Sequence, residues 1–343
     1  MRLTLEQIAG AVWGAAVTQE KGGFVFHRFT EAQSVHFSDY DKTRAQSSAG
    51  VRLEFTTDSD YVSFVFTDAW VSSNRGFFFA DLLVNGRLAA HVGTDLGRRP
   101  EGGPTVRELP DLSHTEKLAP GMKRVTLYLP AITFSRLEKL ELSDGAHFEP
   151  CRPAHRIVSF GDSITEGMDA HFPSLHYINQ TARAFDAEAH NFAISGGCFD
   201  PGILEGEMPP ADLVTVAYGT NDFRKVTPEI FAEAMPLFFR RVAQYYPETP
   251  VFVMVPFYRI PMDETGETFQ IGTLDQVRDA IRREAGQYAN FTVLDSKYFV
   301  APEPSSFGDE RLHPNETGNT AIADHLKREI RSRLGWKERE TAE

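Results

Sequence analysis

Cysteine is scarce in this chain of 343 residues, which contains only Cys151 and Cys198. Two cysteines are too few for a disulfide framework. Cys198 stands beside a pair of glycines and has no base-like neighbour in the sequence, so we interpret it as a small buried apolar residue and not as a nucleophile.

Positive charge is also in short supply. The chain has 35 Lys and Arg against 48 Asp and Glu, which gives a net charge of −13. This balance argues against nucleic acid or an anionic membrane surface as a partner and favours an uncharged or cationic ligand. Oligomeric state is open, with a homo-oligomer as one option.

Several other features are missing. No apolar run reaches the length of a transmembrane helix. No internal repeat or low-complexity segment is present. A metal site could use His171, His176 or Asp169, but these residues lack tight ligand spacing. We therefore expect neither a metal nor a cofactor.

The N-terminus raises the question of secretion, because the apolar residues 8–17 could form the core of a signal peptide. However, only Arg2 precedes them as a positive charge, and Glu6 intrudes. Thr4 and Gln7 have the spacing of a capping box, which predicts a short helix. We therefore expect a cytoplasmic protein.

Residues 22–145 show period-two alternation of apolar and polar residues, as in Val62, Phe64 and Phe66. This period predicts half-buried antiparallel strands. Asn85-Gly86 is a strong hairpin signal. Many short strands predict a β-sandwich or jelly-roll domain over residues 1–150. The segment 94–122 is rich in Gly, Pro and charge and is expected to be a surface loop.

The pattern changes near residue 150, where apolar strands begin to alternate with helices over residues 151–343. This alternation predicts a parallel sheet covered on both faces by helices. The active site of such a sheet lies at the carboxyl ends of its strands. The predicted strands are 155–160, 188–193, 212–218, 250–256 and 291–295, and the predicted helices are 174–186, 228–246, 274–288 and 316–334.

The first strand of this half leads into Gly161-Asp162-Ser163. A serine on a strand-to-helix turn has an exposed hydroxyl, and its N–H lies near a helix N-terminus, where developing negative charge is stabilised. An ordinary turn would use the same residue types. The interpretation as a nucleophile therefore depends on partners further along the chain.

Three later segments supply such partners. Ser195-Gly196-Gly197 follows the second strand and could direct backbone N–H groups at an oxyanion. Asn221 follows the third strand and could donate from its amide, while Asp222 has a structural role. His313, before the last helix, could reach Ser163 as a general base, with a nearby carboxylate to orient it.

With these four segments in this order, residues 155–335 resemble the SGNH, or GDSL-like, hydrolase superfamily. The resemblance implies a three-layer α/β/α flavodoxin-like fold and metal-free ester hydrolysis. Carried over by position, Ser163 is the nucleophile and His313 the general base. The oxyanion hole is then formed by the N–H groups of Ser163 and Gly196 with the side chain of Asn221.

The acid partner of His313 departs from the family pattern, which places an aspartate three residues before the histidine. Glu310 occupies that position here, and Asp309 lies one residue further back. Spacing favours Glu310, whereas side-chain identity favours Asp309 through a one-residue bulge. A dyad of serine and histidine alone is the third alternative.

A β-rich domain ahead of such a hydrolase domain looks like the layout of family-two carbohydrate esterases. This resemblance implies removal of acetyl groups from acetylated oligosaccharides, with exposed aromatic side chains such as Trp70 and Phe223 as stacking platforms. One alternative is a short-chain lipase-like or acyl-thioester hydrolase. Another is a carbohydrate-binding protein with a vestigial hydrolase domain, which the joint presence of the four site segments disfavours.

Overall fold

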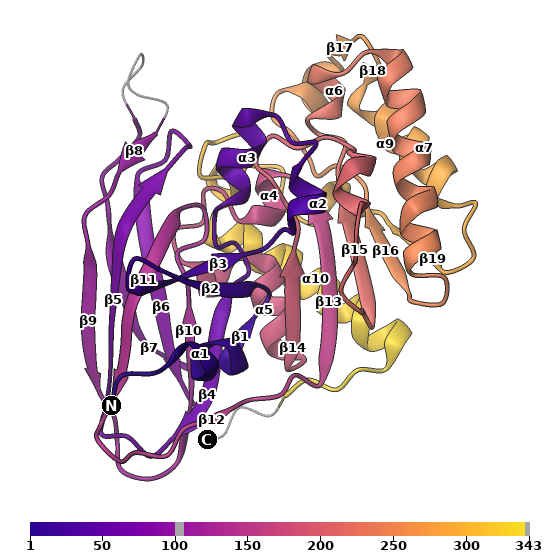
Figure 1. Cartoon of the computed structure of the whole chain (residues 1–343). Helices are drawn as coiled ribbons and strands as arrows, with labels where there is room; N and C mark the ends of the chain where they lie inside the picture. The colour runs from indigo at the N-terminus through magenta and orange to yellow at the C-terminus, as the bar shows by residue number, and fades with distance from the viewer. Residues whose placement is uncertain (100–105, 340–343) are drawn as a thin grey trace.

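The computed structural model describes residues 1–99 and 106–339. Antiparallel strands of the N-terminal part stand beside a parallel sheet with helices on both faces (Figure 1). The first element is helix α1 (Leu5–Ala11), which begins at the predicted capping box. The Thr4 side chain accepts from the Gln7 N–H, and the Gln7 side chain accepts from the Thr4 N–H. The short N-terminal helix is thus confirmed.

Two antiparallel sheets form most of the N-terminal part. One has the order β1-β4-β10-β6-β7 with β12 beside β4, and the other has the order β2-β3-β11-β5-β8 with β9 beside β5. Their strands are β1 (Val12–Trp13), β2 (Ala16–Glu20), β3 (Gly23–His27), β4 (Arg52–Thr57), β5 (Tyr61–Val71), β6 (Phe77–Val84), β7 (Arg87–Asp95), β8 (Arg107–Glu108), β9 (Leu112–Lys117), β10 (Lys123–Tyr128), β11 (Phe134–Leu142) and β12 (Glu149–Pro150).

Apolar side chains from both sheets share one hydrophobic cluster, to which β5 contributes Val62, Phe64 and Phe66. These three residues alternate with less buried neighbours, so the period-two prediction is confirmed. The predicted hairpin is confirmed as well, because β6 pairs with β7 across Asn85-Gly86 and both turn residues have positive φ. A jelly-roll topology stays a prediction.

One feature of this part was not predicted from the sequence, and another was predicted wrongly. Helices α2 (Glu31–Ser34) and α3 (Asp39–Ala45) interrupt the strands. The expected loop over 94–122 contains β8 and β9, and β9 pairs with β5. Strand β9 is polar apart from Leu112, so its sequence carries no period-two signal. Residues 100–105 of that loop lie outside the described residues.

The second half contains the predicted parallel sheet. Its five strands are β13 (His155–Gly161), β14 (Ala187–Asn191), β15 (Leu213–Ala217), β16 (Val251–Met254) and β19 (Phe291–Leu294), in the order β14-β13-β15-β16-β19. This order, 2-1-3-4-5, is that of flavodoxin-like sheets, with the switch point between the first and third strands. The parallel sheet is confirmed at every predicted strand.

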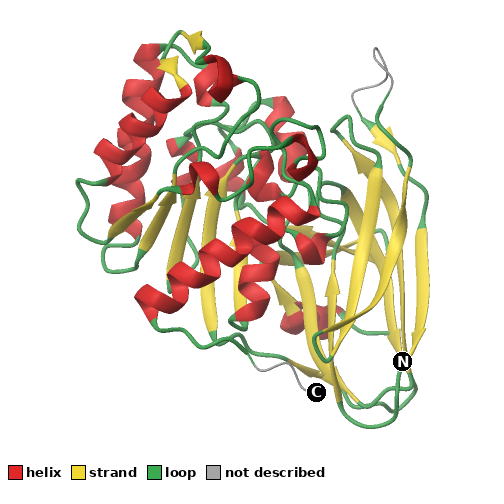
Figure 2. Cartoon of the chain, turned by 180° about the vertical axis from the view of Figure 1, so that it is seen from behind, coloured by secondary structure: helices red, strands yellow, loops and turns green. Residues whose placement is uncertain are grey.

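Helices cover both faces of this sheet (Figure 2). Helices α5 (Tyr177–Ala184) and α10 (Glu316–Leu334) share one hydrophobic cluster with it, and α7 (Pro228–Tyr245) and α9 (Leu274–Ala285) share the other. Shorter elements lie in the connections: α4 (Ser163–Glu166), α6 (Asp222–Lys225), α8 (Met262–Thr265), the β17 (Thr268–Phe269) and β18 (Gly272–Thr273) hairpin, and the 3₁₀ turns Pro173–Leu175, Pro201–Leu204, Ser296–Tyr298 and Pro304–Ser306.

The described residues include no helix long and apolar enough to cross a membrane.

Candidate active site

Ser163 is the first residue of α4, and only Asp162 separates it from strand β13. Asp162 caps this helix, because its Oδ1 accepts a hydrogen bond of 2.9 Å from the Ile164 N–H. Gly161 has no room for a side chain, since a Cβ there would collide with Thr165. The N–H groups of a helix's first turn have no partner within the helix, and here Asp162 takes up that of Ile164.

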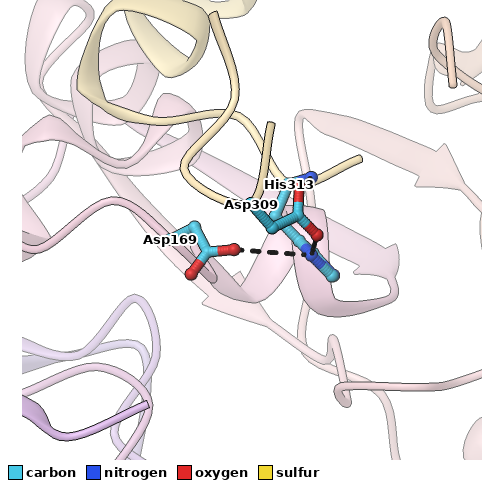
Figure 3. Close-up of side chains that lie close together, drawn as sticks. All are labelled: Asp169, Asp309 and His313. Atoms are coloured by element: carbon cyan, nitrogen blue, oxygen red, sulfur yellow. Dashed lines mark hydrogen bonds and ion pairs between the residues drawn. The ribbon is translucent and has the colours of Figure 1, made fainter. Parts of the chain in front are cut away.

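His313 reaches Ser163 from the loop before α10. The serine Oγ and the histidine Nε2 are 2.8 Å apart, a hydrogen-bond distance between residues 150 positions apart in the sequence. The other ring nitrogen, Nδ1, lies 2.7 Å from Asp309 Oδ2. Figure 3 shows this carboxylate beside the imidazole ring. A serine, a histidine and an aspartate therefore form one hydrogen-bonded chain.

Glu310, which the spacing favoured as the acid, takes no part in this chain. It has a φ of 62°, in the left-handed region, and its side chain is exposed. The left-handed residue reverses the loop so that Asp309, one position earlier, faces the histidine. Asp309 Oδ1 accepts from the N–H groups of Arg311, Leu312 and His313, at 3.2, 2.8 and 3.0 Å.

Asp309 is held as a carboxylate. Burial opposes its ionisation, but the hydrogen bond to His313, the charge of that ring and the backbone N–H groups together hold the pKa of Asp309 well below its usual range. An anion fixed beside Nδ1 favours the tautomer in which Nε2 is free to accept the serine proton.

The segments expected to bind an oxyanion lie at the same edge of the sheet. Gly196 has a φ of +86°, and its carbonyl accepts a hydrogen bond of 2.7 Å from the Lys225 ammonium. The Asn221 amide donates to the Gly197 carbonyl at 3.1 Å, so the Asn221 turn and the glycine loop are joined.

Three residues close to Gly196 and Asn221 in the sequence have contacts or burial that fit a role in the fold and not in the chemistry. Asp222 accepts from the Phe199 N–H at 3.0 Å, and burial raises its pKa to about 6. Burial also raises the pKa of the Cys198 thiol, which disfavours a thiolate nucleophile. Phe223 is only 1% exposed and packs on Phe269, so its interpretation as a sugar platform is wrong. Phe223 points from α6 into the hydrophobic core beside the parallel sheet.

The sequence indicated Asp169 only as a possible metal ligand and gave no role to Arg75, yet both lie beside His313. Asp169 lies 3.5 Å from His313 Nδ1 (Figure 3). Arg75, from the turn between β5 and β6, binds Asp169 through Nε at 2.7 Å and through Nη2. Its Nη2 is also 3.2 Å from His313 Nδ1 and 3.8 Å from Asp309 Oδ2. Arg75 gave no sequence signal because it lies 238 positions from His313.

Asp169, Asp309 and His313 together have the donor types of a metal site, with ligand atoms within 4.8 Å of one another. The Arg75 guanidinium already supplies positive charge to both carboxylates. The other residues considered as ligands point elsewhere: His171 contacts Glu316 and Asp95, and the buried His176 contacts the Ala170 carbonyl.

Comparison with known proteins agrees with this geometry. Residues 159–321 match the GDSL-like lipase/acylhydrolase family. A search of curated protein sequences gave no match.

Solved structures with a similar fold cover nearly the whole chain. A salicylyl-acyltransferase, SsfX3, from a tetracycline biosynthetic pathway has a TM-score of 0.78 and 23% identity over 94% of both chains. An acetyl xylan esterase from the rumen bacterium Butyrivibrio proteoclasticus has a TM-score of 0.61 and 14% identity, covering 98% of this chain and 100% of its own. A family two carbohydrate esterase from Cellvibrio japonicus has a TM-score of 0.60 and 16% identity over 95% of both.

The family match and the parallel sheet together define the class. Residues 159–321 carry the sequence pattern and the parallel-sheet fold of the GDSL-like lipase/acylhydrolase family, so this part of the chain is an ester hydrolase domain.

Proposed function

We propose that this protein removes acetyl groups from acetylated oligosaccharides through an acyl-enzyme on Ser163. The observation that carries the proposal is the continuous chain from Ser163 Oγ through His313 to Asp309, with links of 2.8 and 2.7 Å. A nucleophile, a base and an orienting carboxylate at hydrogen-bond distances are the parts that acyl transfer requires.

In the proposed reaction, Ser163 Oγ attacks the ester carbonyl while His313 Nε2 takes the hydroxyl proton. The N–H groups of Ser163 and Gly196 and the Asn221 amide stabilise the tetrahedral oxyanion. The intermediate collapses as His313 gives its proton to the leaving alcohol. Water, deprotonated by His313, then cleaves the acyl-enzyme, releases acetate and restores Ser163. Asp309 stabilises the imidazolium in both halves.

Two observations support a sugar as the alcohol. Proteins whose names identify them as carbohydrate esterases share the fold across both halves of the chain. The half-buried Trp70 stacks on Phe134, with ring centroids 5.2 Å apart. Ser195, the residue before Gly196, lies close to both rings. An aromatic pair beside the oxyanion loop suits stacking against a pyranose ring.

The first test combines substrate range with loss of the nucleophile. Purified protein is assayed on acetylated xylo- and manno-oligosaccharides and on p-nitrophenyl esters of increasing acyl length. We expect acetyl esters to be preferred. Ser163→Ala should lower kcat by about 10³-fold or more while leaving the thermal unfolding curve unchanged. A preference for long acyl chains would instead support the lipase-like or thioesterase alternative.

A second candidate is transfer of the acyl group to an alcohol other than water. It is favoured by the fold shared with the salicylyl-acyltransferase over 94% of both chains. The same acyl-enzyme serves both reactions, and the acceptor alone decides the product. Adding an alcohol acceptor to the acetyl-ester assay separates them: a transferase yields the new ester at the expense of acetate, whereas a hydrolase yields acetate throughout.

The cytoplasmic location expected from the N-terminal sequence remains part of the proposal, with a substrate already taken up by the cell. Fractionation of producing cells, with antibody detection of the protein, is the direct test.

A further inference from the structure

Three arginines gather at the carboxyl edge of the parallel sheet, next to the proposed catalytic residues. Arg259 follows β16, and its Nη1 donates to the Thr220 carbonyl at 2.8 Å, one residue before Asn221. Arg311 lies in the loop of His313, and its carbonyl accepts from the Ile260 N–H at 2.9 Å. Arg224, on α6, follows Asn221 by three positions. Two loops and one short helix thus place the three arginines at one edge of the sheet, near enough for the charges of Arg224 and Arg311 to act on Arg259, with the Arg224 guanidinium over the Phe269 ring.

Arg259 differs from the other buried arginines among the described residues. Arg52 and Arg278 pair with Glu54 and Asp263 at 2.7 and 2.5 Å, and Arg28 lies 3.8 Å from Glu166. Arg259 is only 8% exposed, yet no described carboxylate oxygen lies within 4.0 Å of its guanidinium. A buried guanidinium without a counter-charge is unfavourable unless an anion binds there.

The acids whose charges act on Arg259, Asp162 and Asp309, form no ion pair with it within 4.0 Å, and both are engaged elsewhere. Asp309 accepts from the His313 ring and from three backbone N–H groups. Asp162 caps α4. Arg224 has no carboxylate partner among residues 1–99 and 106–339, and Arg311 has only a 3.9 Å contact with Asp309. Burial, followed by the charges of Arg224 and Arg311, lowers the pKa of Arg259 to about 10.

We propose that Arg259, with Arg224 and Arg311 at its rim, binds a carboxylate group carried by the ester substrate. The inference rests on the proposed ester hydrolysis at Ser163. A guanidinium offers a planar fork of donors that matches a carboxylate, and an anion would also relieve the repulsion among the three cations. The overall negative charge of the chain had favoured an uncharged or cationic ligand, but this local positive site reverses that expectation.

The carboxylate can belong to either half of the ester. In the alcohol half it corresponds to an acetylated acidic sugar, and in the acyl half to a monoester of a dicarboxylic acid. Two probe pairs separate these sources. The alcohol pair is 4-acetoxybenzoate against uncharged 4-acetoxybenzamide. The acyl pair is the monoanionic 4-nitrophenyl adipate against 4-nitrophenyl hexanoate.

The measured quantity is the ratio of kcat/KM for the anionic probe to that for its neutral partner. In the pair that matches the substrate, Arg259→Met should lower this ratio about tenfold or more, mainly through KM, because a charge-assisted hydrogen bond is lost. Arg259→Lys should retain part of the ratio. Arg240→Gln, an exposed arginine on α7, is the matched control and should keep the wild-type ratio.

The double variant Arg224→Gln/Arg311→Gln changes only exposed side chains, so it carries the test if Arg259→Met fails to fold. It should lower the same ratio, and added salt should lower it in the wild type. Equal ratios in the wild type and every variant, for both pairs, would overturn the carboxylate site. Failure of the ester hydrolase proposal looks different: the neutral probes would be untouched, or Ser163→Ala would cleave them at the wild-type rate.

Discussion

Asp309 organises the loop that presents His313. Its Oδ2 contacts the histidine ring, and its Oδ1 accepts three successive backbone N–H groups. A short aspartate side chain can fold a turn around itself in this way. Glu310, with its positive φ, reverses the direction of the chain between Asp309 and the three residues whose N–H groups donate to that carboxylate. The same residue therefore shapes the loop and orients the ring.

The first residue-scale prediction separates the two acids. Asp309→Asn should lower kcat by about 10³–10⁴-fold, because an amide that donates to Nδ1 stabilises the wrong tautomer. Glu310→Gln, at the exposed neighbouring position, should stay within about twofold of the wild type, as surface substitutions away from a site usually do. Steady-state kinetics on an acetyl ester measures both. Equal losses in the two variants would exclude Asp309 as the orienting acid.

The second prediction concerns the buried Asp162. Burial, helped by the charge of Asp222, raises the pKa of Asp162 to about 7, above the value of about 4 expected in the unfolded chain. As pH rises between these values, the unfolded chain loses this proton first, so the contribution of Asp162 to stability falls. Asp162→Asn keeps the acceptor for the Ile164 N–H and removes the charge.

The Tm of Asp162→Asn minus that of the wild type should therefore grow from pH 4 to pH 7 and then level off. Thermal unfolding followed by circular dichroism across this range gives the difference. A difference that stays constant with pH would show that Asp162 titrates alike in the folded and unfolded chain.

At the scale of elements, α4 is a four-residue helix that holds Ser163 at its start and ends at Gly167. Gly167 has a φ of +101°, and a Cβ there would collide with the ring of the buried His176. The chain then continues through Asp169, which also has a positive φ of 70°. Two residues with positive φ thus end the helix of Ser163 and turn the chain so that Asp169 lies beside His313.

Gly167→Ala should lower the free energy of unfolding by more than the about 1–2 kcal/mol that a left-handed alanine costs, because it adds a clash. Gly335→Ala is the matched control. Gly335 also has positive φ at a helix C-terminus, but a Cβ there meets nothing within 4 Å. Chemical denaturation of both variants measures the difference, and similar losses would mean that the His176 ring moves aside at little cost.

At the scale of the whole molecule, the antiparallel sheets contribute directly to the catalytic edge. Arg28, after β3, donates to the Ser47 carbonyl and also to the carbonyls of Asn191 and Ala193, at 2.5 and 2.9 Å, just before the loop of Gly196. Arg75, before β6, binds Asp169 beside His313. The two halves of the chain therefore share one site.

Replacing Arg75 tests this dependence. Arg75→Met leaves Asp169 and Asp309 facing His313 without their cation, so the protonated ring is favoured. We expect the acidic limb of the kcat/KM profile to move to higher pH and activity at neutral pH to fall about tenfold or more. Arg75→Met/Asp169→Asn removes both charges and should move the limb back. A fall in activity without a shift of the limb would indicate a purely structural role.

The sequence by itself determined the succession of strands and helices along the second half of the chain. It also determined which segments carry the residues of the proposed site. Apolar periodicity is local, and parallel strands bring their carboxyl ends to one edge, so Ser163, Asn221 and His313 could be expected near one another. The Asn85-Gly86 hairpin was likewise readable because its turn requires residues that tolerate positive φ.

Only the tertiary structure showed that Asp309 and not Glu310 contacts His313, because that contact depends on the backbone conformation of one residue and not on spacing. It also placed Arg75 beside His313 and Phe223 in the core. Such contacts join segments far apart in the chain, and nothing in the local residue pattern specifies them. Ionic partners and burial are properties of the assembled fold, which is why the cationic surroundings of this site became visible only there.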